Sequence, residues 1–152
     1  MKIDQADRQI LRELQQNGRL PIVELAERVG LSPSPCLRRV RQLEKRGAIT
    51  GYSASVDAAK LGLNIIAYIQ VNLDQRSEAD TDAFREAVLR EPAIIECYAL
   101  TGSFDYLIKV AVPDLGYFAD LTMQRILRFP GVNSITSGVL LKVLKEPSGI
   151  PV

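Results

Sequence analysis

The sequence of 152 residues contains no histidine and only two cysteines. Histidine is the usual general base near neutral pH and the commonest zinc ligand, so its absence argues against both kinds of site. Cys36 and Cys97 lie far apart in the sequence and form no CxxC pair. We therefore predict a protein that is not an enzyme and has no catalytic residue, metal site or cofactor. The two cysteines are expected to be small core residues that form no disulfide.

Long hydrophobic runs are also absent. No apolar run approaches the roughly 20 residues that a helix needs to cross a bilayer. The first ten residues carry several charges and lack the apolar segment of a signal peptide. These features predict a cytoplasmic protein with no membrane partner. The hydrophobic content of 47% is sufficient for buried cores.

Charge is distributed unevenly between the two parts of the chain. Residues 1–50 contain ten Lys/Arg and six Asp/Glu, whereas residues 51–152 contain nine and twelve. Residues 38–46 alone contain five basic residues and one acidic residue. This asymmetry predicts that the first part binds a polyanion and that the second part has a different task.

Residues 1–50 have the periodicity of three short helices. Asp4 is a suitable N-cap for the first helix, and Pro21 precedes the second. The third begins after Ser32, whose hydroxyl is expected to cap it, and ends at Gly47. Three helices joined by short turns are typical of a helix-turn-helix domain.

The third of these helices has one apolar side and one basic side. A basic helix in this position suits the major groove of DNA, where Arg and Gln donate to base edges while Lys and Ser contact phosphates. We predict DNA contacts for Ser32, Ser34, Pro35, Arg38, Arg39, Arg41, Gln42 and Lys45. The alternative for the whole face is a merely solvated surface. Arg39 lies at the flank of the face, where it contacts either the DNA backbone or an ion-pair partner on the protein.

Residues 63–152 alternate between strand and helix patterns. Strands are expected over 65–73, 94–100, 106–112 and 132–144, with helices over 80–90 and 114–127. The order βαββαβ predicts a ferredoxin-like sandwich, which gives the whole chain an α+β fold class.

The predicted sheet is apolar on both faces at many positions. In the first strand, Ile66 and Tyr68 alternate with Ile65 and Ala67. Two helices cover only one side of a four-stranded sheet. We therefore expect a second subunit to cover the other side.

Short motifs follow one another in a specific order along nearly the whole chain. In the first part they are Ile3-Asp4, Asn17-Gly18-Arg19, Glu24-Leu25-Ala26, Val29-Gly30-Leu31-Ser32-Pro33, Arg39-Val40, Leu43-Glu44 and Gly51-Tyr52. In the second part they are Leu61-Gly62, the loop Thr101-Gly102-Ser103-Phe104-Asp105-Tyr106, and Pro130-Gly131-Val132. Each motif is weak alone, but the ordered set resembles the Lrp/AsnC, or feast/famine, family of transcriptional regulators.

This resemblance has implications for domains and partners. It implies a winged helix-turn-helix DNA-binding domain over 1–50, a linking strand and hinge over 51–62, and a ferredoxin-like effector-binding and oligomerisation domain over 63–152. It also implies double-stranded DNA as a partner, a homodimer that assembles further, often to an octamer, and an amino-acid effector bound in a cleft between dimers. We thus predict a sequence-specific DNA-binding transcriptional regulator whose DNA occupancy or assembly responds to an amino acid.

The loop over 101–105 is the candidate effector site. Gly102 permits a positive φ that exposes backbone N–H groups to a carboxylate, and Asp105 is suited to an ammonium group. Together with the resemblance, these features assign effector binding to Tyr98, Leu100, Thr101, Gly102, Ser103, Phe104, Asp105, Thr136 and Ser137. The alternatives are that Asp105 only holds the shape of a plain turn, and that Tyr98, Thr136 and Ser137 are core or strand surface.

Two other functions are compatible with this organisation. Small enzymes share the ferredoxin-like architecture, and a fold alone does not exclude enzyme activity. The lack of histidine, of a metal cluster and of a nucleophile beside a base argues against that reading. An architectural protein that coats DNA without any ligand is the third possibility.

Overall fold

A computed structural model describes residues 3–74, 78–146 and 149–152. The chain forms two compact units. The N-terminal unit contains the described residues of Met1–Ser55 and of Leu144–Val152, and the C-terminal unit is Val56–Val143. The last residues of the chain thus group with the first part and not with the second domain predicted over 63–152.

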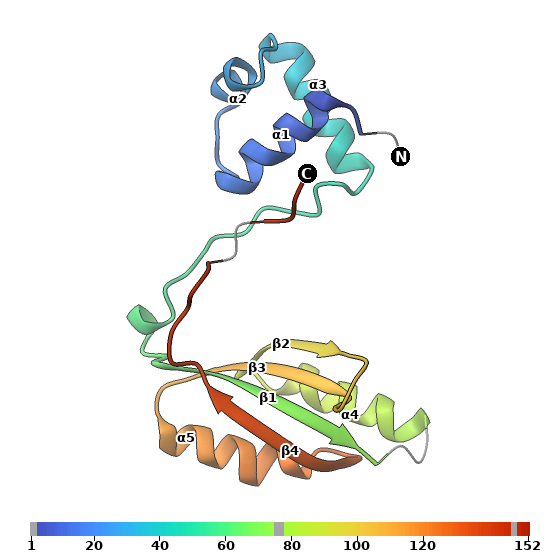
Figure 1. The fold of residues 1–152 in the computed structure, drawn as a ribbon, viewed down its shortest axis with the longest axis vertical. Coiled ribbons are helices and arrows are strands. Elements are labelled where there is room, and N and C mark those ends of the chain that lie inside the picture. The colour runs from blue at the N-terminus through green and yellow to red at the C-terminus, as the bar shows by residue number, and fades with distance from the viewer. Residues whose placement is uncertain (1–2, 75–77, 147–148) are drawn as a thin grey trace. The chain divides into compact units, whose positions relative to one another are not determined.

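The N-terminal unit contains three helices, α1 (Gln5–Gln16), α2 (Ile22–Arg28) and α3 (Pro33–Lys45) (Figure 1). Asp4 caps α1 as predicted: its carboxylate accepts a hydrogen bond from the Asp7 N–H at 2.8 Å, and the Asp7 carboxylate accepts one from the Asp4 N–H. Ser32 is the N-cap residue of α3, but its hydroxyl forms no capping hydrogen bond. That expectation was wrong, and Pro33, which has no N–H to satisfy, occupies the first turn instead.

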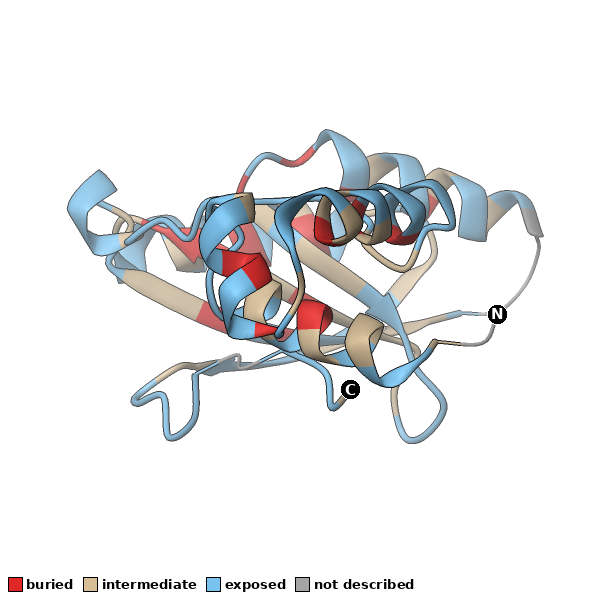
Figure 2. Cartoon of the chain, turned by 90° about the horizontal axis from the view of Figure 1, so that it is seen from above, coloured by how far each residue is buried: buried red, intermediate tan, exposed pale blue. Residues whose placement is uncertain are grey.

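One hydrophobic core joins the three helices of the N-terminal unit. The fully or nearly fully buried residues are Ile10, Leu11, Leu20, Leu25, Ala26, Val29, Cys36, Val40 and Leu43. Buried and exposed residues alternate along the helices, as expected of helices that place one side against a core (Figure 2). Burial of each large aliphatic side chain contributes about 1.5–3 kcal/mol to the free energy of unfolding. The apolar side of α3 is therefore fixed inward and its basic side outward.

The C-terminal unit contains a four-stranded antiparallel sheet in the order β2-β3-β1-β4. The strands are β1 (Ile65–Leu73), β2 (Ile94–Ala99), β3 (Tyr106–Val112) and β4 (Val132–Val139). Helix α4 (Glu78–Arg90) connects β1 to β2, and α5 (Leu115–Asp120) continues through η2 (Leu121–Arg125) and η3 (Ile126–Arg128) toward β4. This arrangement confirms the predicted ferredoxin-like βαββαβ fold and the α+β class.

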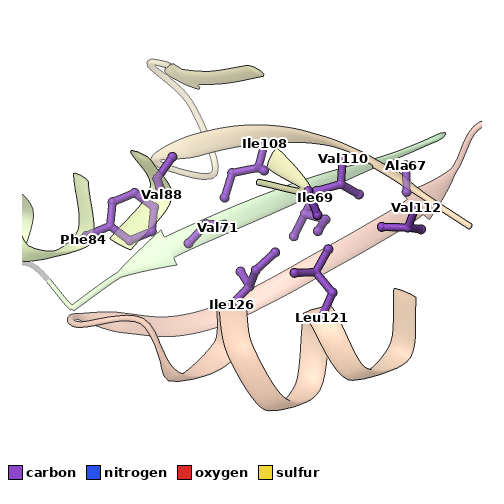
Figure 3. Packing of buried hydrophobic residues seen from close by; sticks show 11 residues of the cluster. Ala67, Ile69, Val71, Phe84, Val88, Ile108, Val110, Val112, Leu121 and Ile126 are labelled. Atoms are coloured by element: carbon purple, nitrogen blue, oxygen red, sulfur yellow. The ribbon is translucent and has the colours of Figure 1, made fainter. Parts of the chain in front are cut away.

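Both helical segments pack on one face of this sheet (Figure 3). Ala67, Ile69 and Val71 alternate along β1 and are fully buried against Phe84 of α4 and against the α5 side. Figure 3 shows Leu121 and Ile126 pointing from the α5 side toward the same strand residues. The helices and the sheet thus form two layers around one core.

The opposite face of the sheet is not covered by helices of the C-terminal unit. Tyr68, Ile95 and Tyr98 are exposed there, with exposed fractions of 37%, 48% and 52%. Ile95 follows Ile94, which packs on the core, and lies on the other face because successive strand side chains alternate. A β-bulge at this point shifts the register between β2 and β3 and places Glu96 on the same side as Ile95. We call this surface the open sheet face.

The segment between the two units differs from the linking strand predicted over 51–62. Among the described residues, no strand pairs with it, and it contains only the short turn η1 (Ala59–Leu61). A strand needs a neighbouring strand to satisfy its N–H and C=O groups. The last strand is also shorter than predicted, because β4 ends at Val139, where its pairing with β1 ends.

Candidate nucleic-acid interface and effector loop

The basic face of α3 is a solvent-exposed, slightly hollowed surface. Ser34, Leu37, Arg38, Arg41, Gln42 and Lys45 line the hollow. Cys36, Val40 and Leu43 anchor the opposite side of the helix in the core. Residues at steps of three or four along a helix lie on one face, so this anchoring determines which side chains point outward.

Three cations of this face are available for an external partner. Within the described part of the chain, Arg38, Arg41 and Lys45 have no ion-pair partner. All three side chains are exposed, as is Gln42 between them. Guanidinium and amide groups can donate in pairs to base edges, and an ammonium group can contact phosphate. The arrangement is therefore suited to a duplex lying along α3.

The remaining predicted DNA contacts lie at the start of the helix. Ser32 and Ser34 are exposed, and the Ser32 hydroxyl is not used for capping. Pro35 is half-buried. Of the first three residues of α3 only Ser34 has a backbone N–H, because Pro33 and Pro35 have none, so the exposed hydroxyls of Ser32 and Ser34 are the groups suited to contacts with the DNA backbone.

Arg39 is used within the N-terminal unit. Its Nη1 atom lies 2.7 Å from Asp4 Oδ2 and 2.8 Å from Asp7 Oδ1. The hydrogen bond with Asp4, followed by that with Asp7, raises the pKa of the guanidinium. The Asp7 N–H, and then Arg39, lower the pKa of the Asp4 carboxyl. Of the two alternatives for Arg39, the structure shows the ion pair, which connects α3 to the N-terminus of α1.

The connector after α3 is attached to the helix by Tyr52. Its hydroxyl donates a hydrogen bond to Glu44 Oε1 at 2.9 Å. The ring lies close to Gly18, where an added Cβ would be 3.2 Å from Tyr52 Cδ1. Burial, and then the hydrogen bond to Glu44, raise the pKa of Tyr52 to about 12. Tyr52 therefore holds the connector on the N-terminal unit.

The loop that follows β2 has the backbone conformation predicted for the effector site. Gly102 has a φ of 139°, which L side chains rarely adopt, and space around it is open. Asp105 Oδ2 accepts a hydrogen bond from the Leu73 N–H at 2.7 Å. The Asp105 N–H donates to the Val71 carbonyl at 3.0 Å, and its own carbonyl accepts from the Leu100 N–H at 2.9 Å. Asp105 thus fastens the loop to the end of β1.

The other predicted effector residues are not brought together within one chain. Thr101 and Ser103 are exposed beside Gly102, Leu100 is 45% exposed and Phe104 is half-buried. Tyr98 lies on β2, whereas Thr136 and Ser137 lie on β4, at the other edge of the sheet.

The sheet register gives the separation of these residues. Tyr98 pairs with Leu107, Leu107 with Gln70, and Gln70 with Thr136. Three strand spacings separate the ends of this row by about 14 Å. Ser137 is on the opposite face from Thr136, because successive side chains of a strand alternate. A cleft that used Tyr98 and Thr136 together would need a second chain.

A cluster of charged and aromatic residues on the open sheet face was not predicted. Lys109 Nζ lies 2.9 Å from Glu96 Oε1 and 5.9 Å from the centre of the Tyr68 ring. The Tyr98 hydroxyl donates to Glu96 Oε2 at 3.1 Å. Glu96 raises the pKa of both Lys109 and Tyr98, chiefly through these hydrogen bonds. The register of β2 with β3 creates this cluster, because the shift between Ile94 and Glu96 pairs Glu96 with Lys109.

Residues 3–74, 78–146 and 149–152 contain no group of three or more Cys, His, Asp or Glu side chains able to hold a metal ion. Cys36 is buried and Cys97 partly buried, both are free, and burial raises the pKa of each thiol. No helix there combines the length and the apolar composition that a membrane span requires.

Comparisons with known proteins agree with both units. A model of the Lrp/AsnC ligand binding domain matches residues 66–150, and a model of winged helix-turn-helix DNA-binding domains matches residues 3–50. Leucine-responsive regulatory proteins of Escherichia coli K12 and Klebsiella pneumoniae are 40% identical over 144 residues, which cover 95% of this chain and 88% of each relative.

Solved structures give the same result. A transcriptional regulator of Neisseria meningitidis in complex with L-Met has a TM-score of 0.94 and 37% identity, covering 99% of this chain and 97% of that one. E. coli AsnC has a TM-score of 0.85 and 26% identity, covering 96% and 97%.

Proposed function

The chain belongs to the Lrp/AsnC family of DNA-binding transcriptional regulators, and from this we propose that an amino acid bound by the C-terminal unit controls its occupancy of DNA. The observation that carries the DNA-binding part is the basic face of α3, where Arg38, Arg41 and Lys45 have no ion-pair partner among the described residues. We propose that Arg38 and Gln42 read base edges and that Lys45 and the serines at the helix start contact phosphates. Arg39 then acts indirectly, by holding α3 against α1.

The loop around Gly102 supports an amino acid as the effector. Its positive φ leaves backbone N–H groups accessible to a carboxylate. Because Asp105 accepts a hydrogen bond from Leu73, we propose that Asp105 shapes the loop for the ligand. The Neisseria regulator, whose structure is similar over nearly the whole chain, was solved with L-Met.

The open sheet face supports a homodimer that assembles further. Exposed Tyr68, Ile95 and Tyr98 form an apolar and aromatic surface of the kind that partner subunits cover. A dimer would place two α3 helices on half-sites about one helical turn, or a multiple of it, apart. A dimer or higher oligomer would also supply the second chain that an effector cleft with Tyr98 and Thr136 needs.

We further propose that the protein acts in the cytoplasm and has no catalytic activity. A transcriptional regulator acts where its DNA is, and the relatives that match the chain are regulators. The sequence lacks the histidine that most acid–base and zinc mechanisms use near neutral pH.

A thermal-shift screen with the twenty common amino acids tests the effector proposal. Specific binding raises the melting temperature by mass action, by an amount that grows with ligand concentration. The amino acids that stabilise the protein are then added to a titration of a selected operator duplex, followed by fluorescence anisotropy. We expect at least one of them to change the Kd for DNA. If none stabilises the protein or changes its DNA affinity, the amino-acid proposal fails and an architectural role is favoured.

Two variants at Asp105 separate loop shape from ligand contact. Asp105→Ala leaves the Leu73 N–H without its acceptor, which costs about 1–3 kcal/mol in the free energy of unfolding. Asp105→Asn keeps an oxygen that can accept this hydrogen bond, so we expect near-normal stability and retained amino-acid binding. A stable Asp105→Asn protein that binds no amino acid would show direct ligand contact instead.

A further inference from the structure

Residues 149–152, which follow the whole C-terminal unit in sequence, lie against α1 in the N-terminal unit. The side-chain amide of Gln15 bonds to the backbone of Ile150 in both directions. Gln15 Oε1 accepts from the Ile150 N–H at 2.7 Å, and Gln15 Nε2 donates to the Ile150 carbonyl at 3.1 Å. Arg12 Nε, about one turn earlier on α1, donates to the Val152 carbonyl at 2.7 Å. We call residues 149–152 the return segment.

Packing accompanies these hydrogen bonds. Val152 is partly buried against the core of the N-terminal unit. The groove between α1 and the connector is lined by Leu11, Leu14, Gln15, Ala48, Ile49, Thr50, Gly51 and Tyr52, together with Ile150 and Val152. Hydrogen bonds to both the N–H and the C=O of one residue, beside an apolar contact two residues later, are of the kind with which a surface holds an extended peptide.

Gly149 is adapted to this position. It has a φ of +80°, and a Cβ at this residue would collide with the side chain of Gln15. The positive φ favours glycine, and a Cβ would force the end of the Gln15 side chain away from the position in which it bonds to Ile150. Any larger residue at position 149 is expected to displace the return segment.

Docking gives the N-terminal unit a second attachment to the C-terminal unit, which is non-covalent at α1. The first connection is the segment after Tyr52, which leads into β1. The second is the segment after Val139, the last residue of β4, which leads to Gly149. Ten residues reach at most about 36 Å when fully extended, so a docked return segment restricts the movement of the N-terminal unit.

From these contacts we infer that the return segment is a tether through which the C-terminal unit acts on the DNA-binding unit. β4 pairs along β1, whose last residue holds Asp105 of the effector loop. On this inference, effector binding changes the end of the sheet near Leu73. The change passes to β4, which pairs with β1 and leads in sequence to the return segment on α1. This inference rests on the proposed function, because it concerns how the effector response reaches the DNA-binding unit.

Two independent variants release the segment. The double variant Arg12→Ala/Gln15→Ala removes its partners on α1, and Gly149→Ala displaces it without any change in α1. The matched control is Gln5→Ala/Arg8→Ala on the same helix, because both residues are exposed and neither side chain bonds to another described residue. Alanine is a favourable helix residue in both double variants, so a loss caused by helix propensity is not expected.

Docking is measured by hydrogen exchange of the Ile150 amide in the full chain. We expect the amide to be protected in the wild-type and control proteins and to exchange at least tenfold faster in both release variants. Unprotected exchange in the wild type would overturn the inference at its first step.

The coupling is measured by duplex titration with and without the stabilising amino acid, whose binding to each variant is checked by calorimetry. Allosteric coupling of ordinary size changes the DNA Kd by about 5–150-fold. We expect a change of this size in the wild-type and control proteins. In both release variants, which still bind the amino acid, the ratio of the DNA Kd values with and without it should fall toward one. A wild-type response in a variant whose Ile150 amide exchanges freely would overturn the tether alone. Absence of any amino-acid response in the wild type would instead overturn the proposed function, and the tether with it.

Discussion

Arg39 connects two helices of the DNA-binding unit through one guanidinium group. Both of its acceptors, Asp4 and Asp7, lie at the N-terminus of α1, where negative charge also interacts favourably with the helix dipole. The Arg39 side chain is 31% exposed, so solvent screens the pair only in part. The position of α3 relative to α1 therefore depends on this contact as well as on the core.

Replacement of Arg39 by alanine is expected to reduce stability. We predict that Arg39→Ala lowers the free energy of unfolding by about 1 kcal/mol. Arg38→Ala should leave it unchanged, because the Arg38 side chain has no ion-pair partner among the described residues. Urea unfolding followed by circular dichroism measures both. The opposite result would be an Arg39→Ala protein of unchanged stability in which the slope of log K for DNA against log salt is reduced, as after loss of a phosphate contact. That result would assign Arg39 to the DNA.

Tyr52 makes the stability of the same unit sensitive to alkaline pH. Its pKa is raised from 10.0 to about 12, so between these values the folded state holds a proton that the unfolded state has lost. Stability from this group is complete below pH 10 and declines as the pH rises toward 12. Tyr52→Phe removes this titration together with the hydrogen bond to Glu44.

The prediction for Tyr52 is a difference between two pH profiles. We expect the wild type to lose more stability than Tyr52→Phe between pH 9 and pH 12, when thermal unfolding is recorded at each pH. Other tyrosines and lysines titrate in both proteins and cancel in the comparison. Parallel profiles would show that the hydroxyl of Tyr52 does not couple to folding.

At the scale of elements, α3 divides its residues between the core and the solvent. The inward residues determine where the helix lies, and the outward residues determine what it binds. Changes on the outward side should therefore alter DNA affinity at almost constant stability, because surface substitutions away from ion pairs or caps usually cost less than about 0.5 kcal/mol.

Two classes of α3 variant should behave differently. Arg38→Ala and Gln42→Ala are expected to reduce discrimination between the operator and an unrelated duplex by about 1–3 kcal/mol, because base-edge contacts carry sequence preference. Lys45→Ala is expected to weaken binding to both duplexes and to lower the slope of log K against log salt by roughly one. Anisotropy titrations over a range of salt concentrations measure these effects, with Arg8→Ala as a control. Unchanged affinity at moderate salt would contradict the assignment of this face.

At the scale of the whole molecule, the open sheet face is the surface on which a second copy is expected. The face combines exposed Ile95 and Tyr98 with the ion pair of Lys109 and Glu96. Because Ile95 lies at a bulge and is 48% exposed, a charge at this position is tolerated in a single chain but is costly in an apolar interface.

The corresponding variant is Ile95→Asp. We expect it to lower the molar mass in solution toward that of one chain, as measured by light scattering after size-exclusion chromatography, without loss of secondary structure. Leu89→Asp on α4, where Leu89 is 74% exposed on the helix-covered side, is the matched control and should retain at least the dimer. An Ile95→Asp protein with the wild-type mass would place the dimer contact on another surface.

The amino-acid sequence by itself determined the two kinds of unit and the face of α3. The sequence predicts the cap at Asp4 and the inward alternation of Ile69 and Val71 in β1, because each feature depends on neighbours within a few residues. The basic side of α3 can also be predicted from the sequence, because a helix has a fixed period.

The tertiary structure alone decided which charged residues remain free for a partner. Arg39 meets Asp4 across 35 residues, Asp105 meets Leu73 across 32, and Arg12 meets Val152 across 140. No local pattern encodes such pairs, because they form only when packing brings distant segments within hydrogen-bonding distance. The same reason explains the missing strand over 51–62, since a strand is defined by a partner that short-range periodicity does not specify.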